Sequence, residues 1–312
     1  MKRKFIITFI LSLIAFTILY STLWFKVFEK ETVAAPGDEI VMEDDDVIED
    51  DYKLPVDNEI VFLMMGVDSN DMKNYRGIRT DTLMLFKVNF DTGKIDILSL
   101  PRDTRVLVRG KEDKLNHAHS YGGTNLTIRT VEDFLGIDLN YYVKVDYKAV
   151  KTIVDAIGGV EIDVPQRMKY KDPTANPPLN IDIMPGLQVL DGQQAHDFLR
   201  FRSGYADGDL GRIKAQQYFM KELIKQTLQP KNILKLPKLV ETYFEYVETN
   251  IPFKLILKGV GAARNIDTEN INTATITGTN KMINGISYLI YDREATEALV
   301  EEMFGDYLLK NK

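Results

Sequence analysis

The sequence predicts an α/β protein, an α-β-α sandwich around a central mixed, twisted sheet, preceded by one transmembrane helix. Three observations predict this arrangement. From residue 59 onward, short apolar segments with strand patterns alternate with segments of helical periodicity, as in a sheet that is covered by helices. Before them, residues 5–25 form an apolar run without any charged side chain. Between the two, residues 31–52 hold ten acidic residues and no basic residue.

The apolar run at residues 5–25 is long enough to cross a membrane, because a spanning helix needs roughly 20 apolar residues. Residues 2–4 are all cationic, and cationic flanks stay on the cytoplasmic side. A cleaved signal peptide is the alternative, but the small residues 34 and 35 come well after the apolar run. We therefore predict a cytoplasmic tail at residues 1–4, an uncleaved anchor at 5–25 and a domain outside the membrane.

The acidic segment accounts for the formal net charge of −7, and the rest of the chain is close to neutral. Its self-repulsion and low aromatic content predict an extended stalk over residues 26–58. A basic excess is typical of proteins that bind nucleic acid, so we expect no nucleic-acid partner. The chain contains no cysteine, which excludes disulfides, thiolate metal sites and cysteine nucleophiles. An extracytoplasmic protein without cysteine favours a Gram-positive source.

The folded domain is predicted over residues 59–312, starting with a buried strand that ends at Gly66. A hairpin follows, because two apolar strands at residues 81–90 and 94–100 are joined by an Asp-Thr-Gly turn. After a loop, alternating patterns predict the following elements in order: a helix at 125–135, a strand at 141–147, a helix at 147–157 that stops at Gly158-Gly159, and a strand at 160–165.

The second half of the domain is predicted to be mainly helical. Several prolines make residues 166–186 an irregular excursion. The remaining predicted elements are a helix from 192 to about 201, a long helix at 211–228 ended by Pro230, a helical region to about 263, strands near 274–279 and 287–292, and a final helix from Arg293.

Cations recur where strands end or a helix begins. Arg79 precedes one predicted strand, Arg102 follows another, and Lys114 opens a loop rich in histidine and glycine. Arg200 and Arg202 flank Phe201, so an extended backbone would direct both to one face. Arg212 and Gln216 are four residues apart at the start of the long helix, on the face that continues into Phe219 and Leu223, and we expect them to point inward.

Each of these cations, taken alone, is explained by a surface salt bridge. Taken together, they favour convergence at one rim, and a cluster of buried cations is costly unless an anion compensates it. Arginine side chains and helix N-termini suit phosphate groups best, so a pyrophosphate is the expected ligand.

Two carboxylates, Asp68 and Asp81, stand at neighbouring strand ends. They could hold a hard divalent cation such as Mg²⁺, with Mn²⁺ as a substitute, or serve as ordinary ion-pair partners of Arg79 and Arg76. His117 and His119 form an H-x-H pair without an evident third zinc ligand, so loop packing and hydrogen bonding are the preferred interpretation. The chain has no phosphate-binding P-loop and no nucleophile elbow.

In combination, these segments resemble the LytR–CpsA–Psr family of bacterial envelope proteins. The pieces that carry the resemblance span about residues 60–228 in order: GVD with RTDTLML, SLPRDT, KLNHAHSYGG, IGGVEIDVP, GLQ-x-LDGQQA through FLRFR, and DGDLGRIKAQQ. The resemblance implies an α/β sandwich with an apolar tunnel for a prenyl chain. It also implies a Mg²⁺-dependent phosphotransferase in the cell membrane, with a single span and an extracytoplasmic catalytic domain.

The resemblance implies the substrates as well. The donor would be an anionic glycopolymer, such as wall teichoic acid or capsular polysaccharide, on an undecaprenyl-pyrophosphate carrier in the membrane lipid. The acceptor would be the C6 hydroxyl of peptidoglycan N-acetylmuramic acid. By motif, Asp68 and Asp81 match the metal carboxylates, and the positions around the pyrophosphate are Arg79, Arg102, Lys114, Arg200, Arg202, Arg212 and Gln216. Arg79 and Arg102 would act in catalysis, and Asp103, the acid nearest to Arg102, is a candidate general base.

Three other functions are weighed against this one. A pyrophosphatase would use the same site with water as the acceptor. A regulator, of the kind described as a transcriptional attenuator, would sense lipid pyrophosphates without turnover, but contact with DNA would have to rely on the short tail before Phe5. A glycosidase with paired carboxylates would leave the arginines unexplained.

Overall fold

The computed structural model describes residues 58–67, 76–173, 179–233, 246–266 and 271–309, together with Val56 and Thr268. The chain divides into two compact units, Met1–Asp51 and Tyr52–Lys312, and every described residue belongs to the second. The predicted tail, the predicted anchor and most of the predicted stalk lie outside the described residues. Within the described part, no helix is both long enough and apolar enough to cross a membrane.

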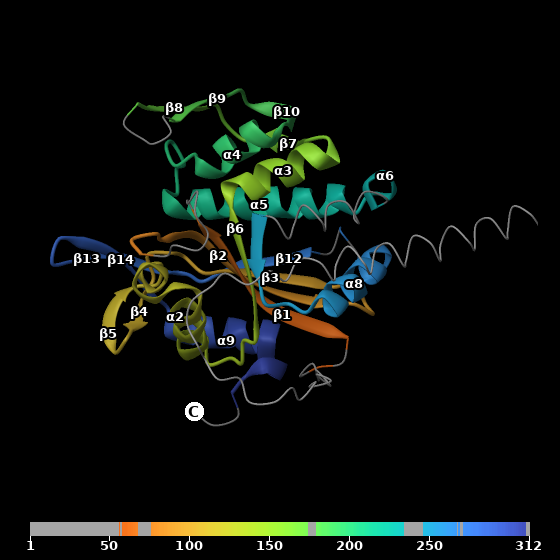
Figure 1. Cartoon of the computed structure of the whole chain (residues 1–312). Coiled ribbons are helices and arrows are strands. Elements are labelled where there is room, and N and C mark those ends of the chain that lie inside the picture. The colour runs from red at the N-terminus through yellow and green to blue at the C-terminus, as the bar shows by residue number, and fades with distance from the viewer. Residues whose placement is uncertain are drawn as a thin grey trace, which may run out of the picture. The chain divides into compact units, whose positions relative to one another are not determined.

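A six-stranded sheet with the order β11-β6-β1-β2-β3-β12 forms the centre of the second unit (Figure 1). Its strands are β1 Glu59–Val67, β2 Thr80–Asn89, β3 Ile95–Ser99, β6 Tyr141–Asp146, β11 Val247–Thr249 and β12 Ile271–Thr275. β1 pairs antiparallel with β2 and parallel with β6, and β12 pairs parallel with β3. The predicted mixed sheet and the β2–β3 hairpin are therefore confirmed.

Helices cover both faces of the sheet, as the near-continuous apolar sequence of β1 requires. In Figure 1, α3 Tyr147–Ile157, α4 Gly192–Arg200 and α5 Asp209–Thr227 lie on one side of the sheet, and α2 His117–Leu135 and α9 Arg293–Phe304 lie on the other. Side chains of β1 alternate between the two layers. Met64 packs with residues of α5, whereas Leu63 and Met65 pack with residues of α2 and α9.

Smaller hairpins surround this sandwich. Their strands are β4 Arg105–Val108 with β5 Lys111–Lys114, β7 Val160–Val164 with β10 Gly186–Leu190, β8 Met168–Asp172 with β9 Leu179–Ile183, and β13 Gly278–Ile283 with β14 Ile286–Tyr291. The short helical elements are α6 Pro230–Ile233, α8 Phe253–Ala262, η1 Ala263–Asn265 and η3 Gly305–Tyr307. β4–β5 and β13–β14 lie next to each other at one end of the sheet (Figure 1), where Thr104 and Leu289 form a β-bridge.

Several predicted elements differ from the structure. Residues 166–186 were expected to be irregular, but they contain the strands β8 and β9. The helix expected from residue 125 begins at His117, and Gly122–Gly123 interrupt it with non-helical backbone angles without ending it. The strand expected near 274–279 is split between β12 and β13, and β11 lies in a region expected to be helical.

Local sequence explains where the helices near the sheet edge begin. The Asp146 side chain accepts a hydrogen bond from the backbone N–H of Ala149 and caps α3 directly after β6. Asp191 and Gln194 form a reciprocal capping box at the start of α4. Gly208, with φ 59°, allows the sharp entry into α5. These caps hold the three helix starts in fixed positions.

Candidate functional site

The candidate site begins at the turn that follows β3. The backbone N–H of Thr104 donates to the carbonyl of Pro101 at 3.0 Å, and the buried Thr104 hydroxyl donates to the same oxygen at 2.6 Å. This doubly bonded turn fixes Arg102 and Asp103, the two residues between them. The sequence prediction that both follow the β3 strand end is confirmed.

Asp81, on the neighbouring strand β2, joins two of the predicted arginines. Arg102 donates from Nη1 to Oδ1 of Asp81 at 2.6 Å, and Arg202 donates from Nη2 to Oδ2 at 2.9 Å. The two oxygens of one carboxylate therefore hold two guanidinium groups from distant parts of the chain. Arg102 and Arg202 are therefore ion-pair partners of Asp81, whereas the sequence analysis had considered Arg79 and Arg76 as the alternative to a metal ion.

A second carboxylate, Asp209, extends the network to the start of α5. Arg212 donates from Nη2 to Oδ1 of Asp209 at 2.9 Å, and Nη2 of Arg102 lies 3.9 Å from the same oxygen. Arg212 is only 3% exposed, and Gln216, one turn further, is also buried. The prediction that these two side chains point inward is confirmed. We call Arg102, Arg202, Arg212, Asp81 and Asp209 the arginine cluster.

The arginine cluster carries more positive than negative charge, because three guanidinium groups face two carboxylates. The pKa of Arg102 is raised: burial alone would lower it, but attraction by Asp81, Asp209 and Asp103 outweighs that effect. The pKa of Arg212 is lowered, first by burial and then by repulsion from Arg102. Among the described atoms, the Nε groups of both arginines are buried and donate no hydrogen bond. An anionic ligand would relieve both the repulsion and the missing bonds.

Lys114 reaches the site from β5. Its Nζ lies 2.8 Å from Oδ1 of Asp103 and 5.9 Å from the centre of the Tyr288 ring on β14. Arg102 Nε lies 3.8 Å from the other oxygen of Asp103. Asp103 therefore stands between the arginine cluster and the β4–β5 hairpin, which places Lys114 in the predicted neighbourhood.

Arg200 and Arg79 are also predicted site residues, and neither belongs to the arginine cluster. Arg200 ends α4 and stacks over the ring of Tyr147 at 5.5 Å, while Arg202 pairs with Asp81. The expected extended backbone is wrong for Arg200, which is still helical, whereas the buried Phe201 after it is extended. Arg79 is exposed and lies just before β2. The pKa of the Tyr121 hydroxyl is raised, mainly by its hydrogen bond with Asp113, and the nearby charge of Arg79 opposes this increase.

Sequence reasoning missed three residues that shape the site. Asp209 could have been found, since it stands one turn before Arg212 on the same helix. Gln217 is buried and donates to Ser99 Oγ at 2.8 Å and to the carbonyl of Ala274 at 2.7 Å, which ties α5 to the ends of β3 and β12. Tyr147 could not be identified from the sequence, because its contact with Arg200 joins residues that are distant in the chain and are brought together only by the tertiary fold.

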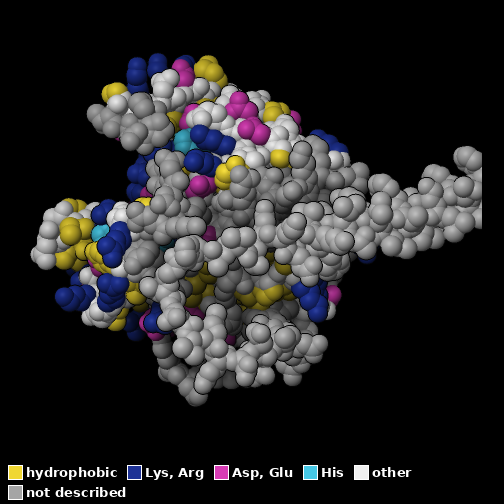
Figure 2. All heavy atoms as spheres, in the orientation of Figure 1, with side chains coloured by type: hydrophobic (Ala, Val, Ile, Leu, Met, Phe, Trp, Pro, Cys, Tyr) yellow, Lys and Arg dark blue, Asp and Glu magenta, His cyan; other side chains and the backbone are white. Residues whose placement is uncertain are grey.

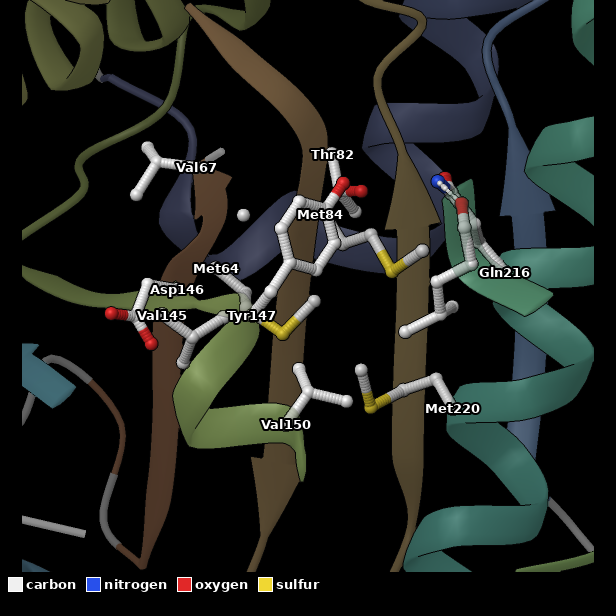
Figure 3. A pocket seen from close by; sticks show the side chains of 12 residues that line it. Met64, Val67, Thr82, Met84, Val145, Asp146, Tyr147, Val150, Gln216 and Met220 are labelled. Carbon is white, nitrogen blue, oxygen red and sulfur yellow. Dashed lines mark hydrogen bonds between the residues drawn. The ribbon is translucent and has the colours of Figure 1, made fainter. Parts of the chain in front are cut away.

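An apolar pocket adjoins the arginine cluster between the sheet and helices α3, α4 and α5. It opens to solvent, and the cavity itself measures about 50 Å³. Figure 3 shows Met64, Met84 and Met220 pointing into a common space beside the Tyr147 ring. A smaller hollow, lined by Asp81, Arg102 and Arg212, shares Thr82, Met84 and Gln216 with it. The apolar pocket and the arginine cluster therefore form one continuous site.

The predicted metal carboxylates are only partly described. Asp81 lies at the site, but Asp68 lies outside the described residues. Among the described side chains, no group of three or more histidines and carboxylates is arranged to hold a metal. The two histidines of the H-x-H pair make separate hydrogen bonds: Nδ1 of His117 with Asp113 at 2.8 Å and Nδ1 of His119 with the carbonyl of Ile78 at 2.8 Å. Both histidines therefore make the hydrogen bonds that the sequence analysis preferred, although they lie in α2 and not in a loop.

Comparison with known proteins identifies relatives across most of the chain. The model of the LytR_cpsA_psr family matches residues 27–305. A teichoic acid transferase of Halalkalibacterium halodurans, named polyisoprenyl-teichoic acid–peptidoglycan teichoic acid transferase TagU, is 32% identical over 250 residues, which cover 78% of this chain and 77% of the relative. The protein of the same name from Bacillus subtilis is 30% identical over 246 residues, which cover 77% and 76% of the two chains.

Solved structures show the same fold. The crystal structure of Bacillus subtilis TagV is 30% identical and superposes with a TM-score of 0.67, covering 78% of this chain and 96% of that one. A structure of TagT bound to LIIa-WTA gives the same TM-score at 24% identity, covering 82% and 94%. The α/β arrangement with a central mixed sheet is therefore shared with proteins of known structure.

Proposed function

This chain belongs to the LytR–CpsA–Psr family, and on that basis we propose that it transfers an anionic glycopolymer from a polyprenyl-pyrophosphate carrier to peptidoglycan. The two relatives described above are named as polyisoprenyl-teichoic acid–peptidoglycan teichoic acid transferases, which supports this class of donor and acceptor. Undecaprenyl is the carrier and the C6 hydroxyl of N-acetylmuramic acid the acceptor group in this proposal.

One observation supports the proposal most strongly: the arginine cluster opens directly into the apolar pocket. A lipid pyrophosphate has an anionic head on an apolar tail, and a single ligand of this kind would satisfy both halves of the site at once. Gln216, Thr82 and Met84 line both parts and mark the junction between head and tail. Arginine side chains suit the head because each presents several donors in a planar fork.

The proposed reaction is a phosphoryl transfer. The acceptor hydroxyl forms a new O–P bond to the phosphorus that carries the sugar polymer, and the bond from that phosphorus to the oxygen of the prenyl phosphate breaks. The prenyl phosphate leaves with the bonding electron pair, and the hydroxyl proton passes to Asp103. Arg102, Arg202 and Arg212 hold the phosphate oxygens and stabilise the charge that develops on them. Arg79, Arg200 and Lys114 remain proposed contacts of the same head group.

A Mg²⁺ ion, replaceable by Mn²⁺, is part of the proposal. Mg²⁺ in phosphate sites is held by one or two carboxylates together with substrate oxygens, so the half-buried carboxylate of Asp81 fits this chemistry, with Asp68 as the second proposed ligand. The bound ion would neutralise charge on the pyrophosphate. Since both oxygens of Asp81 also contact arginines, Arg102 and Arg202 would compete with the ion or share the carboxylate with it.

The proposed cellular location of the protein follows from its proposed lipid-linked donor. We propose that residues 5–25 anchor the chain in the cytoplasmic membrane of a Gram-positive cell, with the catalytic domain on the outer side. The anchor would confine the enzyme to the surface that holds its lipid donor and so raise their effective concentration.

The test is product analysis with a labelled, lipid-linked polymer. The full-length protein in membrane vesicles receives the donor with and without peptidoglycan, and the label is followed into the glycan and the lipid product. Label bound to muramic acid, together with release of prenyl monophosphate, supports the transferase. Hydrolysis to free polymer phosphate that is unaffected by peptidoglycan would identify a pyrophosphatase. Binding of the donor without any product would identify a non-enzymatic sensor. Either of these last two results overturns the proposal.

A further inference from the structure

An exposed aromatic ring stands beside the site on the side of Lys114. Tyr121, in the first segment of α2, is 45% exposed although it is fixed at several points. Its hydroxyl donates to Oδ2 of Asp113 at 2.8 Å, and its ring meets that of His117 edge-on at 5.8 Å. Nδ1 of His117 contacts Oδ1 of the same carboxylate at 2.8 Å. We call Asp113, His117 and Tyr121 the aromatic platform.

The backbone of Tyr121 is also held in place by a hydrogen bond. Nη2 of Arg109 donates to the carbonyl of Tyr121 at 2.5 Å. Directly after Tyr121, Gly122 and Gly123 leave the helical conformation, so that the ring stands at the end of a short helical segment. Packing into the apolar core does not explain this position, because the Tyr121 ring remains 45% exposed. Its hydroxyl, its ring edge and the backbone carbonyl of Tyr121 are nevertheless all held by neighbouring residues. Such an arrangement suits a ligand that stacks on an aromatic face and hydrogen-bonds at its rim.

The platform is connected to the site through consecutive residues of β5. The backbone N–H of Lys114 donates to Oδ1 of Asp113 at 2.7 Å, and the Lys114 side chain pairs with Asp103. Neither β5 nor α2 contributes a residue to the lining of the apolar pocket or of the adjoining hollow. Figure 2 shows Lys, Arg, His and hydrophobic side chains gathered over this end of the molecule, around β4–β5 and β13–β14.

The proposed reaction requires an acceptor on this side. In phosphoryl transfer, the attacking and leaving oxygens lie roughly in line with the phosphorus. If the prenyl phosphate leaves toward the apolar pocket, the acceptor hydroxyl must approach from the opposite direction. Asp103, the proposed base, lies between Arg102 and Lys114, and neither Asp103 nor Lys114 lines the apolar pocket or the adjoining hollow. A sugar next to the accepting sugar would then lie over β5 and the start of α2.

We infer that the aromatic platform is an acceptor subsite, in which Tyr121 stacks on a sugar ring of the peptidoglycan glycan strand. Asp113 and His117 keep the ring in place and offer hydrogen bonds to the sugar's hydroxyl or acetamido groups at its rim. A pyranose ring suits this surface because it combines an apolar face of C–H groups with polar groups at its edge. This inference rests on the proposed transferase function and adds to it the place where the acceptor binds.

The test measures acceptor dependence with the full-length protein in vesicles. The acceptor is a peptide-free oligosaccharide of alternating N-acetylglucosamine and N-acetylmuramic acid. Tyr121→Ala should raise the KM for this oligosaccharide on the order of ten-fold, the loss typical of an aromatic contact at a binding surface, while kcat changes less than about two-fold. Tyr121→Phe keeps the ring and should change the KM less than about three-fold, because only the hydrogen bond to Asp113 is lost.

Tyr170→Ala is the matched control, since Tyr170 is 39% exposed on the β8–β9 hairpin and lines neither the apolar pocket nor the adjoining hollow. An unchanged acceptor KM in Tyr121→Ala, or a loss confined to kcat, overturns the subsite. A direct measurement, saturation-transfer NMR of the oligosaccharide with the protein in nanodiscs, should show contact in the wild type and in Tyr121→Phe but not in Tyr121→Ala. Failure of the proposed function gives a different result: a wild type that consumes the donor but transfers nothing to any glycan.

Discussion

Arg102 and Arg212 are both buried guanidinium groups in one cluster, yet their surroundings move their pKa values in opposite directions. Arg102 has three carboxylates around it, Asp81, Asp209 and Asp103, and is held in place before any ligand arrives. Arg212 has one close partner and is repelled by Arg102. In the proposed reaction, Arg102 would therefore be the preorganised donor, and Arg212 would gain most when the anionic head group binds.

Arg102→Ala tests this preorganisation. Removing one such donor costs about 2.7 to 4 kcal/mol in the transition state, so transfer should fall by roughly 100-fold or more. The measurement is label transfer to peptidoglycan under saturating donor. Arg167→Ala is the control, because Arg167 forms an exposed ion pair with Asp182 at 2.8 Å, and such pairs contribute little. Transfer within a few-fold of wild type by Arg102→Ala contradicts the role given to Arg102.

His119 makes stability depend on pH. It is almost fully buried, and its pKa is lowered, first by burial and then by the charge of Lys144, against the hydrogen bond with the carbonyl of Ile78 and the charge of Glu248, which raise it. Below its ordinary pKa of about 6.5, the unfolded chain therefore binds a proton that the folded chain does not. The free energy of unfolding should decrease as the pH falls through this range toward the lowered pKa.

His119→Asn isolates this contribution, because the amide of asparagine can still donate to the carbonyl of Ile78 but does not titrate. Chemical denaturation of both proteins at pH 7, 6 and 5 gives the comparison. The decrease in unfolding free energy between pH 7 and 5 should be smaller in the variant. The same decrease in both proteins would show that His119 does not bind its proton preferentially in the unfolded state.

At the scale of elements, the contact between α3 and α4 determines the shape of the apolar pocket. Tyr147 and Val150 of α3 and Leu199 of α4 line the pocket. The two helices meet at Gly192, whose backbone N–H donates to Oδ1 of Asp155 at 2.7 Å. A Cβ at this position would lie 2.5 Å from the carbonyl oxygen of Lys151 and 2.8 Å from its Cα, so glycine is what allows the close approach.

Gly192→Ala should therefore destabilise the fold by about 1–3 kcal/mol, the usual cost of overpacking, and weaken binding of a prenyl phosphate. Thermal unfolding measures the first effect, and titration with a fluorescent prenyl phosphate measures the second. Gly261→Ala is the control: it lies in α8 with nothing within 4 Å of an added Cβ, and should stabilise by up to about 1 kcal/mol. Equal unfolding temperatures for the two variants would show that α3 and α4 can separate without cost.

Elements with local signals were predictable from the sequence. Helix α3 is flanked directly by its capping residue Asp146 and by Gly158, which ends it. The β2–β3 hairpin is predictable because an Asp-Thr-Gly turn joins its two strands. The β4–β5 hairpin was not predictable, because Lys111–Lys114 is wholly charged and its turn uses Arg109 and Gly110 at positive φ without the usual Asn-Gly or Asp-Gly signature. The contacts around it are tertiary as well as local: Arg105 pairs with Glu112 across the hairpin and lies over the ring of Tyr288 on β14.

In the candidate site, too, features with a local sequence signal were predictable and features that depend on tertiary contacts were not. The inward direction of Arg212 and Gln216 follows from helical spacing relative to Phe219, and the structure confirms it. The sharing of Asp81 by Arg102 and Arg202 could not be predicted, because these side chains come from three separate segments that only the tertiary fold brings together. The role of Asp68 as a metal ligand stays a prediction, since it lies outside the described residues.

At the scale of the whole molecule, the proposed function joins a lipid donor in the membrane to an acceptor in the wall. The predicted stalk at residues 26–58 would set how far the catalytic domain reaches from one to the other. The family model matches from residue 27, so this segment belongs to the part of the chain that relatives share. If the stalk is only a spacer, its length matters and its acidic sequence does not.

Replacing residues 31–52 with a neutral Gly/Ser linker of equal length tests this distinction. The reach of a flexible linker grows as about the square root of its length, at roughly 5–6 Å per square root of a residue, so the replacement should keep transfer to intact peptidoglycan within about two-fold. The matched variant has a linker of half that length, with a reach lower by about 30%. It should lose transfer to intact peptidoglycan but keep transfer to a soluble glycan oligosaccharide, because a diffusing acceptor needs no reach. A loss of more than about ten-fold with the full-length neutral linker on the soluble oligosaccharide would mean that the acidic residues themselves take part. Lost self-repulsion would shorten the reach of the stalk, but reach does not affect transfer to a diffusing acceptor.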